Sequence, residues 1–140
     1  MFNNILLAVD GSEHALNAAK VAAGMARDLK SEVLRIVIVV DPVPSFLGEP
    51  NFQNAINARM KEAHAIQDAA LEAVGEIPGE IHIEILEGSP AEVILTVADT
   101  RKNDLIVMGS RGLGRLAGAL LGSQSQKVVR HAACPVLIVR

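Results

Sequence analysis

The stretch Ile5-Leu-Leu-Ala-Val9 is a short, wholly apolar run that ends at Asp10-Gly11-Ser12. A run of this length without polar alternation is typical of a parallel strand that is buried on both faces. Either Ser12 or Asp10 can cap a helix that follows at once, because apolar residues recur there at helical spacing as far as Leu29. A buried strand that leads directly into a helix is the first unit of an α/β protein.

The same alternation of apolar runs and helical patterns continues to the end of the chain. We expect four more strands, over Val33–Val40, Ile81–Leu86, Leu105–Met108 and Val136–Val139, and three more helices, over Asn51–Val74, residues 90–101 and Ser123–His131. The order βαβαβαβαβ predicts a single domain, residues 1–140, with a Rossmann-like α/β fold. Its core is an open, parallel five-stranded sheet with helices on both faces.

Two local patterns refine this prediction. The stretch Ile81–Leu86 alternates apolar and polar residues, which is typical of a strand that is solvated on one face and lies near a sheet edge. Ser89-Pro90-Ala91-Glu92 is a helix-start signal in which serine is the N-cap, proline takes the first helical position and glutamate completes a capping box.

Composition narrows the class of protein. Of 140 residues half are apolar, yet only three are Phe and none is Trp or Tyr, so the core must be aliphatic. No apolar run approaches the roughly 20 residues of a membrane span, and no secretory signal is visible, so we expect a soluble, cytoplasmic protein without membrane insertion. The lone Cys134 excludes an intrachain disulfide and a thiolate zinc cluster.

Charge is distributed unevenly along the chain. The net charge is −3, but residues 105–140 contain no acidic residue and five basic ones, whereas residues 1–104 contain eight basic and sixteen acidic residues. An anionic ligand is therefore expected at the C-terminal third. Nucleic acid is not expected, because the basic residues are interleaved with glycines and apolar residues and no aromatic residue is available for base stacking.

A glycine-rich segment follows the fourth expected strand. Gly109 and Gly112 leave this strand, and nine residues later Gly122-Ser123-Gln124-Ser125 opens a helix. Unpaired amides and the positive end of the helix dipole can hold phosphate oxygens there. The two serine hydroxyls add donors, and Arg111 and Arg115 add charge.

Other interpretations of this segment remain open. Ser123 with Gln126 forms an S-x-x-Q pattern, which is itself a capping box. A Walker loop is not favoured, because Gly122 is followed by serine and not lysine. A dinucleotide fingerprint at residues 112–118 is not favoured either, because no acidic residue follows it.

Three features together resemble the universal stress protein family over essentially the whole chain. They are the opening Ile5-Leu-Leu-Ala-Val-Asp-Gly-Ser12, the spacing Gly109-x2-Gly112-x9-Gly122-Ser123, and the ending Val129-Arg-His-Ala-Ala-Cys-Pro-Val-Leu-Ile-Val139. In that family this form of the glycine motif goes with ATP binding. The resemblance also implies the fold of the adenine nucleotide alpha hydrolase-like proteins.

The resemblance implies a role for individual residues of an ATP site. It places Ala8 and Val9 in the base pocket, Asp10 near the adenosine and the backbone of Val39 against adenine. It places Met108 and Gly109 beside the ribose and phosphates. The residues implied around the triphosphate are Gly112, Gly122, Ser123, Gln124 and Ser125. Gln124 departs from the family pattern, in which a small apolar residue is common at this position.

The function implied is that of a module that binds ATP, with or without Mg, and regulates a stress response through an unidentified protein partner. Catalysis is less well supported, because only Asp10 and Asp41 lie at the expected edge of the sheet, so at most a slow ATPase is expected. One alternative is a nucleotide-independent partner of a transporter or kinase. Another is a phospho-acceptor receiver domain, although Asp10 stands alone where such a domain needs an acidic cluster.

Two further expectations concern surfaces. If Val136–Val139 lies at the sheet edge, pairing with a second copy would cover its backbone, and the resemblance implies the same homodimer. The proline-rich residues 41–50 are in a position to form a lid over the base pocket.

Overall fold

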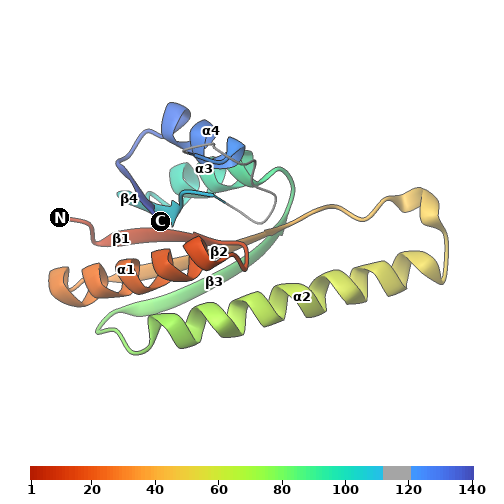
Figure 1. Ribbon diagram of the computed structural model, residues 1–140, viewed down its shortest axis with the longest axis horizontal. Coiled ribbons are helices and arrows are strands. Elements are labelled where there is room, and N and C mark those ends of the chain that lie inside the picture. Colours follow the sequence, from red (N-terminus) through yellow and green to blue (C-terminus); the bar gives the residue numbers. More distant parts are fainter. Residues whose placement is uncertain (112–120) are drawn as a thin grey trace.

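The computed structural model describes residues 1–111 and 121–140, which form a parallel sheet between two layers of helices (Figure 1). The strands are β1 (Asn4–Val9), β2 (Val33–Val40), β3 (Glu80–Glu87), β4 (Leu105–Gly109) and β5 (Val136–Val139). The helices are α1 (Glu13–Leu29), α2 (Asn51–Val74), α3 (Pro90–Thr100) and α4 (Ser123–His131), with a short 3-10 turn, η1, over Ser45–Leu47. The predicted α/β fold and its element order are confirmed.

The strand order is β3-β2-β1-β4-β5, with every neighbouring pair parallel. Helices α1 and α2 cover one face, and α3 and α4 cover the other (Figure 1). The chain winds outward from β1 in one direction to β3 and then in the other direction to β5, so the winding reverses between β1 and β4. In such sheets ligands bind outside the carboxyl ends of the strands at this reversal.

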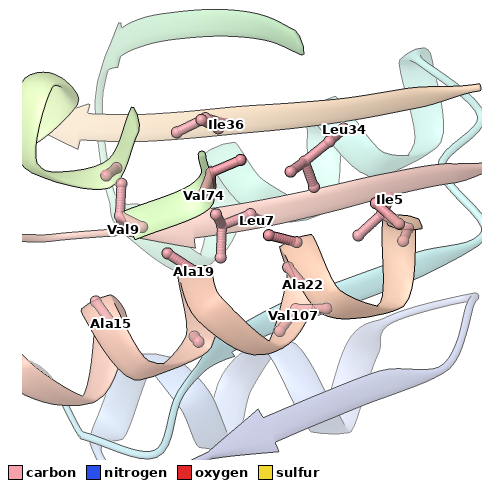
Figure 2. Packing of buried hydrophobic residues seen from close by; sticks show 14 of the residues in the cluster. Ile5, Leu7, Val9, Ala15, Ala19, Ala22, Leu34, Ile36, Val74 and Val107 are labelled. Carbon is pink, nitrogen blue, oxygen red and sulfur yellow. The ribbon is translucent and has the colours of Figure 1, made fainter. Parts of the chain in front are cut away.

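Helix α1 packs closely on the centre of the sheet because its inner face consists of alanines. Ala15, Ala19 and Ala22 are at most 3% exposed and lie against Leu7 and Val107 (Figure 2). Small side chains let the helix approach the sheet, and the branched side chains of the strands fill the remaining space. This predicted aliphatic core holds the first turn of α1 beside the ends of β1 and β4.

Strand β3 lies at a sheet edge, as its alternation predicts. Its Glu84 accepts hydrogen bonds from Arg35 at 3.0 Å and from Arg101 at 3.1 Å. Burial alone would raise the pKa of Glu84, but the hydrogen bonds and charges of the two arginines outweigh it and lower the pKa below its usual value. The carboxylate therefore stabilises the α3 side of the sheet in its charged form.

We expect Glu84→Gln to lower the free energy of unfolding by about 1–2 kcal/mol at pH 7, because it leaves the largely buried Arg35 without its counter-charge. A lowered folded-state pKa contributes stability above the unfolded pKa, and this contribution is lost as the pH falls through the folded value. The difference from wild type should therefore shrink below pH 4.5 in urea titrations followed by circular dichroism. The exposed Glu80→Gln is the control, and an equal loss in both variants would contradict the role of Glu84.

The connection from β2 to α2 runs outward past the carboxyl edge of the sheet together with the first half of α2 (Figure 1). Arg59 fixes the start of this connection, because its Nη1 donates a hydrogen bond to the carbonyl of Asp41 at 2.7 Å. At its far end Phe46 is 85% exposed. The expected lid over the base pocket is therefore not seen, because this segment follows α2 instead of folding back over the strand ends.

Among the described residues, no helix combines the length and apolar character that crossing a membrane requires.

Candidate functional site

The carboxyl ends of β1 and β4 meet at the reversal of the winding and bring the predicted base-pocket residues together. Ala8 lies opposite Met108 in the pairing of β1 with β4, and both are at most 8% exposed. On the other side of β1, Val9 pairs with Ile38, so Val39 lies at the level of Asp10. These apolar positions and one carboxylate thus lie side by side at the carboxyl ends of neighbouring strands.

The turn from β1 to α1 fixes the position of Asp10. Its Oδ1 accepts the backbone N–H of Ser12 at 3.0 Å, and Gly11 between them has φ +84°, a conformation that favours glycine. The Oγ of Ser12 accepts the N–H of Ala15 at 3.2 Å, so Ser12 caps α1. The alternative that Asp10 is the N-cap is therefore wrong, and the half-buried carboxylate of Asp10 stays at the carboxyl end of β1.

The end of β4 is joined to the first turn of α1. A Cβ on Gly109 would lie 2.9 Å from the Cβ of His14, so only glycine lets the two elements approach this closely. A hydrogen bond of 2.7 Å connects Nδ1 of His14 with Oγ of the buried Ser110. Neither residue was among those predicted to form the site. Ser110 could have been found from its place beside Gly109, whereas no sequence signal pairs it with His14.

The two ends of the glycine-rich segment are held together at β4. Gly122 donates its N–H to the carbonyl of Ser110 at 2.7 Å, and Ser110 donates to the carbonyl of Val139 at 2.7 Å. The buried Oγ of Ser125 donates to the carbonyl of Gly109 at 2.9 Å. Gly112 and Arg115 lie outside the described residues, so their roles at the phosphates stay predictions.

Helix α4 begins with backbone donors that have no acceptor among the described residues. Gly122 is its N-cap and no side chain caps it, so the alternative capping box of Ser123 with Gln126 is wrong. Within residues 1–111 and 121–140, the N–H groups of residues 123–125 have no acceptor, as expected for the first turn of a helix. The buried Nε of Arg111 also lacks an acceptor there. These donors and the positive end of the helix dipole suit an anion.

The side chain of Gln124 makes a hydrogen bond to another helix, α3. Its Oε1 accepts the N–H of Ala91 at 2.9 Å, at the first turn of α3. Ser89 is the N-cap of α3 and Pro90 its first residue, as predicted, but Ser89 makes no side-chain capping bond. The predicted capping box is therefore replaced by a side chain from α4.

In the ranges that the structure describes, no cluster of three or more His, Cys, Asp or Glu side chains is arranged to hold a metal ion.

Comparison with known proteins identifies the family of this chain. A sequence model of the Universal stress protein family matches residues 1–140. A universal stress protein of Thermus aquaticus is 49% identical over 140 residues, covering 100% of both chains. The chain belongs to the universal stress protein family.

Solved structures of other universal stress proteins share this fold. UspA from Lactobacillus plantarum matches with a TM-score of 0.87 and 28% identity, over 99% of this chain and 98% of that chain. A universal stress protein in complex with cAMP matches with a TM-score of 0.70 and 26% identity, over 97% of this chain and 95% of that chain.

The contact between β4 and α1 in this universal stress protein can be tested directly. We expect Gly109→Ala to lower the free energy of unfolding by about 2 kcal/mol, because a methyl group there forces α1 away from the sheet. Gly24→Ala within α1 meets no atom within 4 Å and should stabilise the protein by up to about 1 kcal/mol. Urea unfolding followed by circular dichroism measures both. If Gly109→Ala leaves the free energy of unfolding unchanged, the close approach of α1 to β4 is not required.

Proposed function

We propose that this universal stress protein binds an adenine nucleotide, ATP in particular, in the crevice between β1 and β4. The observation that carries the proposal is the start of α4, where three backbone N–H groups have no acceptor among the described residues. The buried Nε of Arg111, the residue after Ser110, has no acceptor among the described residues either. Phosphate oxygens supply the acceptors that these groups lack. The related universal stress protein in complex with cAMP supports an adenine nucleotide as the ligand class.

The remaining predicted residues suit the nucleoside. Ala8, Val9 and Met108 are buried at the strand ends and offer an apolar floor for a base, while Val39 is half-buried on the neighbouring strand. The carboxylate of Asp10, held by Ser12, is an acceptor for sugar hydroxyls.

A binding role fits better than a catalytic one. Hydrolysis requires a group that positions water and, in most such enzymes, a Mg²⁺ ion held by the protein. Asp10 is the acidic residue at the crevice, whereas the side chain of Asp41 is 83% exposed and lies 3.8 Å from Arg59. We therefore infer a cytoplasmic regulatory module that reports its nucleotide state to a protein partner, with ATP bound with or without Mg and hydrolysed slowly at most.

The test uses the absence of Trp and Tyr. Purified protein should absorb little in the near ultraviolet, so a co-purified adenine nucleotide dominates the spectrum and can be released and identified by mass spectrometry. Calorimetric titration with ATP should show that Arg111→Gln weakens binding about 10-fold, because a charged donor to phosphate is lost. Arg130→Gln in the last turn of α4 removes the same charge far from the donors and should change affinity less than about 2-fold.

The outcomes separate the candidate functions. If the protein carries no nucleotide and does not bind ATP with Mg, the proposal is contradicted and a nucleotide-independent partner protein is favoured. Equal losses in Arg111→Gln and Arg130→Gln would show that general charge, and not the start of α4, attracts the ligand. Phosphate release over many turnovers would contradict a binding role.

We further propose that the protein is a homodimer paired through β5, which lies at a sheet edge. Ile106 and Ser110 donate to the carbonyls of Pro135 and Val139, so alternate residues of β5 face β4. The backbone groups of Val136 and Ile138 therefore point outward and are available to a second copy.

We expect Ile138→Pro to convert the dimer to a monomer, because it removes the outward N–H without removing a bond to β4. Sedimentation equilibrium should give twice the chain mass for wild type and for the control Ile138→Val, which keeps the N–H. Circular dichroism confirms that the proline variant is folded. A folded Ile138→Pro dimer would show that the two copies associate elsewhere.

A further inference from the structure

Gln124 connects the starts of two helices that are far apart in the sequence. Its Oε1 accepts the N–H of Ala91 at 2.9 Å, so a side chain in the first turn of α4 caps the first turn of α3. Ser89, which occupies the N-cap position of α3, makes no side-chain hydrogen bond to the helix. The capping bond that α3 would otherwise obtain locally therefore comes from α4.

The same turn of α4 is fixed from its other side by the neighbouring residue. Ser125 is buried, and its Oγ donates to the carbonyl of Gly109 at 2.9 Å, which ties the turn to the end of β4. Gln124 and Ser125 thus attach consecutive residues of α4 to two different elements. A helix start held in this way cannot rotate or shift without breaking one of the two bonds.

Fixed donors bind an anion better than mobile ones. The N–H groups of residues 123–125 have no acceptor among the described residues, and they move with the turn that Gln124 and Ser125 hold. When donors are already oriented, binding does not have to order them, so more of the interaction energy appears as affinity. This advantage applies to phosphate groups, which the donors would contact, and not to a base or sugar bound at the strand ends.

We propose, on the basis of the proposed nucleotide site, that Gln124 is a positioning residue that sets the preference of this site for phosphorylated ligands. Its carboxamide spans the distance from α4 to Ala91 and keeps the first turn of α4 in place. The side chain acts through the backbone donors that it holds. Its contribution therefore depends on the reach of the side chain as well as on its polarity.

Two substitutions separate reach from polarity. Gln124→Leu keeps the approximate size and removes both polar atoms, whereas Gln124→Asn keeps the carboxamide but is one methylene too short to reach Ala91. We expect both variants to bind ATP about 5- to 10-fold more weakly than wild type, with adenosine affinity changed less than about 2-fold. Both should also lower Tm by about 2–5 °C, since α3 loses its cap.

Gln126→Leu is the matched control, because Gln126 is exposed and lies two residues further along the same helix. Its side chain makes a 3.4 Å hydrogen bond to the carbonyl of Leu121, just before α4, and none to α3 among the described residues. This variant should leave the ratio of ATP to adenosine affinity unchanged. Titration calorimetry with ATP and with adenosine measures the ratio, and circular dichroism measures Tm for all four proteins.

A purely structural role would lower Tm without changing the ratio, and this result would overturn the proposal while leaving the nucleotide site intact. Wild-type binding by Gln124→Asn would likewise show that reach is not required and overturn it. If wild type binds neither ATP nor adenosine, the proposed function itself is wrong, and the role of Gln124 falls with it.

Discussion

The close packing of α1 on β1 and β4 is the constraint on which the site depends. Alanines along α1 and glycine at position 109 bring the helix backbone near the strand ends, where His14 contacts Ser110 at 2.7 Å. Larger side chains would separate α1 from β4 and open the edge at which the winding reverses. The aliphatic core thus positions the crevice as well as stabilising the fold.

The distribution of charge agrees with this geometry. Acidic residues are confined to residues 1–104, and the described part of the last third contributes basic residues and the positive end of the α4 dipole. A phosphate near the start of α4 therefore meets little negative charge from its own segment. Asp10 lies on the other side of the reversal, at the end of β1.

Sequence patterns were sufficient to predict the fold, because each strand and helix has its own spacing of apolar residues and its own turn or capping residues. They also located most of the candidate site, since carboxyl ends of parallel strands must share one edge. They failed where a hydrogen bond depends on distant residues. Neither the His14–Ser110 pair nor the bond from Gln124 to Ala91 has a local signal, because each joins residues on different elements. Ser89 illustrates the same limit. It is the N-cap of α3, as its motif predicts, but the side chain that accepts an N–H of the first turn is that of Gln124.

One residue connects the proposed nucleotide site with the proposed dimer edge. Ser110 accepts the N–H of Gly122, at the start of α4, and donates its own N–H to the carbonyl of Val139 at the end of β5. A ligand that fastens the start of α4 also restrains the backbone that holds β5. If both proposals hold, thermodynamic linkage requires any such effect to be reciprocal: whatever factor the nucleotide contributes to dimer affinity, the dimer contributes to nucleotide affinity. A regulatory module can use this reciprocity, because a partner that recognises one assembly state then senses the nucleotide without touching it.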